Sequence, residues 1–208
     1  MSAGVLSILS ITTLIILLYT GWLPSLAKRL DCKYSQVIWG LIVCFLLNLI
    51  PIFSLTPQYE VEPGIFVVIG LLLFFIMKLR LRTIFFLQIN IILLGSLIFL
   101  WHEIFDVQTK WDQSFFRIST LIGVTLISLI MRKTILEKLY LQIGSYVFAH
   151  VLMVLIYTDV VKPVTIGDKI FLDSLWLGIL CIILCHFGLE ALLLLWNKRY
   201  DNLHSTRK

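Results

Sequence analysis

His186 and Glu190 stand four residues apart in the apolar stretch HFGLEALLLLWNKRY, residues 186–200. In a helix this spacing puts both side chains on one face, with Cβ atoms about 6 Å apart, so that imidazole and carboxylate can hydrogen-bond. Ionisable groups are costly inside a bilayer and need partners there. Because imidazole and carboxylate can bind a metal ion or pass protons, this pair is the first candidate site.

The expected depths of other polar residues extend this pair to a candidate cluster. Helical rise places Glu190 about 9 Å and His186 about 15 Å from Trp196, where the last apolar run is expected to end. His150 lies about 16 Å from the inner end of its own run, and Asn90 about 10 Å from the inner end of another. We therefore expect His150 and His186 at similar depth. Asn90 is expected level with Glu190.

Two interpretations of this intramembrane polar cluster stay open. In the functional interpretation, the two histidines and Glu190 form a proton relay, a cation path or a metal site. In the structural interpretation, they join helices through interhelical hydrogen bonds of about 1 kcal/mol each. The residue types alone do not identify a metal.

Arg117 and Asp173 form a second candidate, an ion pair at the outer interface. Asp173 stands a few residues into the last apolar run, where the helix macrodipole favours a carboxylate. Arg117 stands equally near the outer end of the fifth run. The alternative is that water solvates each side chain separately.

These residues must be positioned by membrane-spanning helices. Of the 208 residues, 60% are hydrophobic and 14% charged, with a mean hydropathy of +0.99, which leaves too little polar surface for a water-soluble protein. A spanning helix needs about 20 apolar residues. The sequence predicts an all-α, polytopic transmembrane bundle forming one domain, residues 1–208. Its seven expected spans are about 5–26, 35–55, 64–77, 83–101, 114–131, 139–157 and 170–196.

The third run is the shortest of the seven. At 1.5 Å per residue, residues 64–77 extend about 21 Å, less than the ~30 Å of a hydrocarbon core. Lys78 and Arg80 can lengthen the span by snorkelling, and Pro63 suits the first turn of a helix. Seven spans are favoured. If this run re-enters instead of crossing, six spans remain and both termini share one side.

Basic residues alternate along the connectors and so predict orientation. The first, third and fifth connectors, KRLDCK, KLRLR and RKTILEK, each hold three Lys or Arg, whereas the second holds none and the fourth one. Lys and Arg mark cytoplasmic connectors. The N-terminus is therefore expected outside and the C-terminus in the cytoplasm. The net charge of +5 then reflects orientation, and no nucleic acid partner is implied.

Three phrases carry a resemblance to a known group of proteins. They are GWLPSLAKRL after the first run, IPIFSLTP closing the second and IGDKIFLDSLWL entering the last. The chain resembles small polytopic membrane proteins of Bacillus and its relatives, in particular the uncharacterised YphA-like proteins, in layout, size and short phrases over much of its length. The resemblance implies a Gram-positive plasma membrane and a role in the envelope or in sporulation. It transfers no functional residue.

Two functions are carried forward. The first is a non-enzymatic membrane partner or assembly factor, which would bind the lipid bilayer and other membrane proteins or a second copy of itself. The alternative is a small transporter or proton-coupled permease that uses His150, His186 and Glu190. The sequence holds no Gly-rich phosphate loop, Gly-x-Ser-x-Gly or HExxH motif. Enzyme activity is therefore disfavoured, no catalytic residue is assigned and no cofactor is expected.

The predicted orientation can be tested with a reporter fused after Lys208. We expect a reporter that works only in the cytoplasm to be active at this position, because the last span runs from the outside to the cytoplasm and is followed by a basic tail. Activity of the complementary, externally active reporter at this position would contradict the seven-span arrangement.

Overall fold

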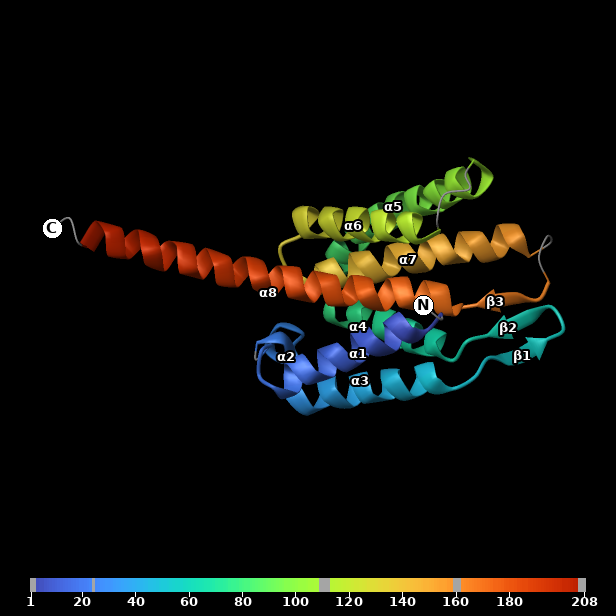
Figure 1. Ribbon diagram of the computed structural model, residues 1–208, viewed down its shortest axis with the longest axis horizontal. Helices are drawn as coiled ribbons and strands as arrows, with labels where there is room; N and C mark the ends of the chain where they lie inside the picture. The colour runs from blue at the N-terminus through green and yellow to red at the C-terminus, as the bar shows by residue number, and fades with distance from the viewer. Residues whose placement is uncertain (1–2, 24, 109–112, 159–161, 206–208) are drawn as a thin grey trace.

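The computed structural model is a helical bundle with a small sheet at one end (Figure 1). It describes residues 3–23, 25–108, 113–158 and 162–205. Within these ranges the helices are α1 (Val5–Tyr19), α2 (Leu26–Arg29), α3 (Tyr34–Leu49), α4 (Gly64–Lys78), α5 (Leu81–Gln108), α6 (Gln113–Met131), α7 (Ile135–Tyr157) and α8 (Lys169–Ser205). The strands are β1 (Phe53–Thr56), β2 (Tyr59–Val61) and β3 (Val164–Ile166). The mainly helical fold agrees with the sequence prediction, and each of the seven apolar runs overlaps one helix of 15 or more residues.

Several helix boundaries differ from the predicted spans. Helix α1 ends at Tyr19 instead of 26, because Gly21 adopts a φ of 77° that no α-helix contains. Helix α3 ends at Leu49 instead of 55, two residues before Pro51, since proline disfavours helix in the residue before it. Helices α5 and α8 instead run past their apolar segments, because hydropathy marks the length in contact with lipid and not the end of the helix.

The small sheet was not predicted from the sequence. Its order is β1-β2-β3, with β1 antiparallel to β2 and β2 parallel to β3. Val61 pairs with both Phe53 and Ile166. The sheet thus joins the connector between α3 and α4 to the connector between α7 and α8, at what we call the sheet end of the bundle. Three-residue and four-residue strands lack the length of alternating pattern by which strands are recognised.

The opposite end, which we call the α2 end, collects the first, third and fifth connectors. The Nζ atom of Lys78, at the end of α4, lies 2.8 Å from the Asp31 carboxylate between α2 and α3. Arg29 of α2 contacts α8. The long helices therefore run alternately between the two ends, as Figure 1 shows.

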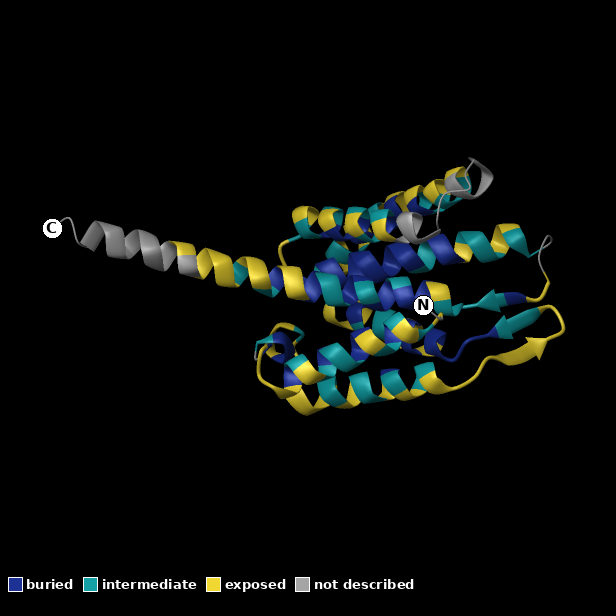
Figure 2. Cartoon of the chain, in the orientation of Figure 1, coloured by how far each residue is buried: buried dark blue, intermediate teal, exposed yellow. Residues whose placement is uncertain are grey.

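The core lies along α7 and the first half of α8 (Figure 2). Leu141 of α7 and Leu175 and Ile182 of α8 are fully buried. Polar side chains are also buried here, and Gln142 accepts a hydrogen bond of 3.3 Å from Ser128 of α6. Helices α3 and α5 expose rows of large apolar side chains instead, as expected where lipid is the solvent.

Within the residues that the structure describes, three helices are long and apolar enough to cross a membrane, by length and composition: Leu81–Ile104, Ile135–Tyr157 and Lys169–Leu194. Four further apolar helices are shorter, namely α1, α3, α4 and the Ile118–Met131 part of α6. These lengths are compatible with a membrane location.

Two glycines let α5 and α7 approach closely. A Cβ atom added to Gly95 of α5 would lie 2.8 Å from the backbone oxygen of Ser145, and one added to Gly144 of α7 would lie 2.5 Å from Ile91. Small residues commonly permit such contact between membrane helices, where van der Waals packing drives association.

We expect Gly95→Ala to lower the thermal stability of the purified protein. Its methyl group meets backbone that cannot move aside, and overpacking costs about 1–3 kcal/mol. Gly123→Ala in α6 is the matched control, because nothing lies within 4 Å of its added Cβ. The control should keep or slightly raise stability, since Ala favours helix over Gly by up to about 1 kcal/mol. Equal destabilisation of both variants would contradict this packing account.

Candidate functional site

A cluster of four ionisable side chains lies at the α2 end: Arg29 of α2, Lys138 of α7, and His186 and Glu190 of α8. Arg29 and Glu190 form a bidentate pair, with both Nη atoms 2.6 Å from a carboxylate oxygen. A guanidinium matches a carboxylate in this geometry and fixes its direction as well as its distance. The pair ties the short helix α2 to α8.

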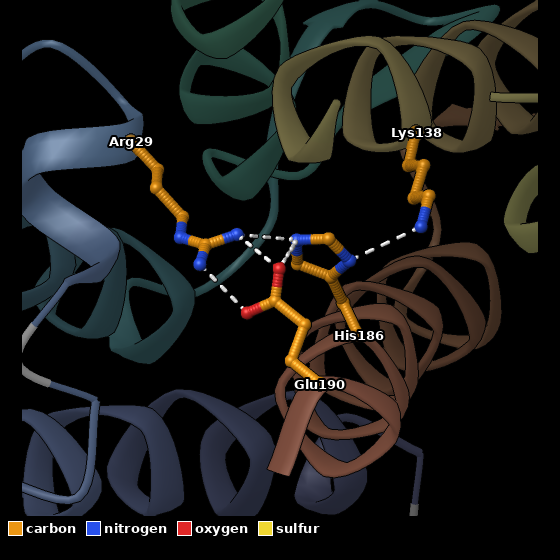
Figure 3. A network of polar contacts seen from close by, with 4 residues as sticks. All are labelled: Arg29, Lys138, His186 and Glu190. Atoms are coloured by element: carbon orange, nitrogen blue, oxygen red, sulfur yellow. Dashed lines mark hydrogen bonds and ion pairs between the residues drawn. The ribbon is translucent and has the colours of Figure 1, made fainter. Parts of the chain in front are cut away.

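His186 is the centre of this cluster, which we call the Arg29–His186 network (Figure 3). Its Nε2 atom lies 3.0 Å from Arg29 Nη1, and its Nδ1 atom lies 3.1 Å from Lys138 Nζ. The same Nε2 atom lies 3.7 Å from Glu190 Oε1. One imidazole therefore contacts α2 and α7 at once, and α8 is held between them.

The local sequence explains how these side chains meet. Leu26 and Ala27 are buried and anchor α2 against the bundle, which leaves Arg29 on the side facing α8. The Arg29 guanidinium also lies 5.2 Å from the centre of the Phe187 ring, within the range of a cation–π contact. Apolar anchors thus position a cation that the pairing with Glu190 then holds.

The network has more positive than negative groups. Arg29 and Lys138 face one carboxylate, and Lys138 is buried with 6% of its surface exposed. A neutral imidazole offers one acceptor nitrogen only, so His186 can accept from one of the two basic side chains and not from both. Among the described residues no group of three or more His, Cys, Asp or Glu side chains could hold a metal ion. The contacts of the Arg29–His186 network are suited to holding α2, α7 and α8 together at the α2 end.

His150 does not join His186, contrary to the expectation of similar depth. The Nε2 atom of His150 accepts a 2.8 Å hydrogen bond from the Gly167 backbone, and its ring stacks on Phe171 at the sheet end. His186 contacts Lys138 near the opposite end of α7. The estimate was wrong because it placed Trp196 level with the inner end of the sixth run, whereas α8 already reaches the α2 end at His186 and Glu190 and projects beyond it to Ser205.

Asn90 is also separate from Glu190 in its contacts. Its amide donates a 3.1 Å hydrogen bond to the Phe86 carbonyl within its own helix. Of the four residues expected to form one cluster, only His186 and Glu190 lie together. Their spacing on one helix face was the one relation that the sequence alone specified.

Asp173 has partners that the sequence did not indicate. Its carboxylate accepts hydrogen bonds from the backbone N–H groups of Gly4, at 2.8 Å, and Ser7, at 2.7 Å. It therefore caps the N-terminus of α1, where four backbone N–H groups have no partner in the helix. The expected partner Arg117 lies in α6, but its side chain falls outside the described residues.

Sequence reasoning missed two members of the network and a further acidic group. Arg29 and Lys138 were used only as markers of the cytoplasmic side, although each is followed by a leucine that packs in the bundle, half-buried Leu30 and buried Leu139, which could have indicated a partner there. Glu62, between β2 and α4, is buried with 1% of its surface exposed. Burial raises the pKa of its carboxyl, and the nearby Lys169 partly opposes this.

Comparison with protein-family models, with curated proteins and with solved structures found no match for this chain.

We expect Arg29 and Glu190 to be coupled in a double-mutant cycle. Glu190→Gln should lower stability by about 1 kcal/mol, because both side chains are about one-third exposed and water weakens the pair. In a protein of this size that is a fall in Tm of about 2–4 °C. Arg29→Gln/Glu190→Gln should be little worse than either single variant. Strictly additive losses, measured by thermal unfolding in detergent, would show that the pair does not stabilise the fold.

Proposed function

We propose that this chain is an integral plasma-membrane protein that serves as a non-enzymatic partner or assembly factor for another membrane protein. In this proposal all seven long helices cross the bilayer, with the N-terminus outside and the C-terminus in the cytoplasm. A Gram-positive host and a role in the envelope or in sporulation are part of the proposal, and they rest only on the resemblance of three short phrases and the general layout to the YphA-like proteins.

The distribution of charge between the two ends supports the proposed orientation. The α2 end holds Arg29, Lys78 and Lys138 in contact with α8 or with the α2–α3 turn. Basic residues mark the cytoplasmic side, so the α2 end would face inward. The sheet end, with the buried carboxylates of Glu62 and Asp173, would face outward.

The projection of α8 beyond the bundle carries the proposed role. Helix α8 has 37 residues and so extends about 55 Å, against a hydrocarbon core of about 30 Å. The segment from Lys169 to Glu190 already covers about 32 Å. The residues that follow therefore lie at or past the inner edge of the hydrocarbon.

Large apolar side chains occupy that projecting part of α8. Leu192, Leu193, Leu194 and Trp196 each expose more than 60% of their surface. Apolar groups beyond the hydrocarbon core gain by burial against another protein surface. We name residues 192–196 the α8 extension, and we propose that it binds an apolar helix of a partner membrane protein.

The alternative of a proton-coupled permease has less support. It required His150, His186 and Glu190 to line one path, and the two histidines lie at opposite ends of the α7–α8 pair. The remaining pair, His186 and Glu190, is engaged with Arg29 in an arrangement that fits helix packing.

A photo-crosslinking amino acid at Leu193 tests the proposal in intact cells. We expect a discrete adduct larger than the chain, because a partner surface covers this position. The matched control is the same amino acid at Leu97 of α5, whose exposure of 56% is close to the 62% of Leu193. Leu97 lies within the expected span and should give lipid adducts only.

The mass of the adduct identifies the kind of partner. Twice the mass of the chain, reproduced with purified protein in vesicles, would show a second copy as the partner. A different mass present only in cells would show another protein. If position 193 behaves like position 97, lipid covers the α8 extension and the proposed role is wrong.

A further inference from the structure

An apolar cavity of about 760 Å³ lies between α1, α3, α4, α7 and α8. Its inner wall includes Ile143 of α7 and Trp176 of α8, which is 1% exposed, while Trp39 of α3 and Phe66 of α4, on its outer side, are 66% and 54% exposed. The cavity therefore reaches the core of the bundle and opens sideways between α3 and α4. In a membrane this opening would face lipid.

The shape of this cavity follows from how α3 and α4 meet. At the sheet end they approach closely, because a Cβ added to Gly64 would lie 3.1 Å from the Asn48 side chain. At the α2 end the Lys78–Asp31 pair bridges them at 2.8 Å. Between these points Gly40 and Gly70 face the cavity with nothing within 4 Å of an added Cβ. The two helices are thus held together at their ends and separated in the middle.

The length of the cavity matches one leaflet of a bilayer. Its lining on α4 runs from Phe66 to Lys78, about 18 Å, and on α3 from Gln36 to Leu47, about 16 Å. Half of a ~30 Å hydrocarbon core is about 15 Å. A chain that enters from the α2 end would lie along this length, with its polar head at the level of Lys78.

The polar mouth of the cavity has the charge to hold an anionic head. Its polar lining residues are Asp31, Cys32, Gln36 and Lys78, all at the α2 end. The two connectors that meet there, KRLDCK and KLRLR, contain six basic residues and one acidic residue. That acid, Asp31, is 82% exposed in its side chain, so a lipid phosphate can take its place beside the Lys78 ammonium. Basic sites between helices on the cytoplasmic side are typical of anionic lipid recognition.

We propose that this cavity binds one acyl chain of an anionic phospholipid from the inner leaflet, with the lipid phosphate held by Lys78. The lipid enters sideways between α3 and α4 and keeps its second chain in the bilayer. This inference rests on the membrane location and the inward-facing α2 end proposed above. It adds a specific ligand to a bundle proposed to act as a partner protein.

Fluorescence of Trp176 provides a direct test. A variant that keeps Trp176 and replaces the other five tryptophans by Phe is reconstituted in vesicles of identical lipid composition in both leaflets. The bilayer is mainly unlabelled phosphatidylcholine. To it is added a small fraction of one lipid with brominated chains, which is brominated phosphatidylglycerol in one sample and brominated phosphatidylcholine in the other. Bromine quenches indole at short range, and Trp176 is buried from bulk lipid. We expect quenching about fivefold more effective with brominated phosphatidylglycerol, the preference that one cation near the membrane surface confers.

Two pairs of variants locate the binding. Lys78→Gln should remove most of that preference, whereas Lys133→Gln, an exposed basic residue of the fifth connector, should preserve it. Gly70→Leu places a side chain into the cavity from a position whose added Cβ has nothing within 4 Å, and it should abolish quenching by either lipid. Gly123→Leu, on α6 and outside the cavity lining, also has nothing within 4 Å of its added Cβ and should leave the quenching unchanged.

The proposal is overturned if Trp176 is quenched equally by the two lipids or if Gly70→Leu leaves the quenching intact. Retention of phosphatidylglycerol by the unaltered chain, measured by native mass spectrometry against phosphatidylcholine, repeats the test without tryptophan replacement. Equal retention of the two lipids would also overturn it. Because both leaflets of the vesicles match, a wrong orientation would not change these results and would be detected separately by the reporter after Lys208.

Discussion

The bidentate contact between Arg29 and Glu190 is the constraint on which the α2 end depends. In the proposed membrane location, a carboxylate at this position of α8 would lie close to the edge of the hydrocarbon, where an uncompensated charge is costly. The guanidinium compensates it, and in doing so it holds α2 against α8. His186 then adds α7 through Lys138. One ion pair and one imidazole thus join three segments that are distant in sequence.

The two ends of the bundle are joined by different means. At the sheet end, the Asp173 carboxylate accepts from the backbone of Gly4 and Ser7 and so joins α8 to the start of α1. Strand β3 pairs with β2 and brings the sixth connector beside the second. At the α2 end the ties are made by side-chain charges. Backbone pairing therefore organises one end, and charge pairing organises the other.

These ties at both ends explain why the middle of the bundle can hold a cavity. Helices α5 and α7 approach closely at Gly95 and Gly144. On the other side of α7, Gly40 of α3 and Gly70 of α4 line the cavity of about 760 Å³, with nothing within 4 Å of an added Cβ atom. Glycine thus permits close packing between α5 and α7 and an open cavity between α3 and α4. The surrounding side chains determine which of the two results.

The sequence by itself determined the helical, membrane-compatible character of the chain and the approximate place of each long helix. It also determined the proximity of His186 and Glu190, because these properties depend on local composition and on helical spacing. It did not determine which helices meet. His150 and Asn90 have the polarity expected of partners, yet they bond elsewhere, and His150 lies at the sheet end instead of beside His186.

Only the tertiary structure decided that Arg29 pairs with Glu190, that Asp173 caps α1 and that three short strands form a sheet. Among these contacts, the separation of the two residues along the chain varies from a few positions in the β1–β2 pairing to more than 160 for Arg29–Glu190 and Gly4–Asp173. Such contacts depend on how packed helices are rotated and shifted along their axes relative to one another. Neither the rotation nor the shift can be derived from the residue spacing within a single helix. An offset of a few turns in α8 was enough to move His186 from mid-bundle to the α2 end.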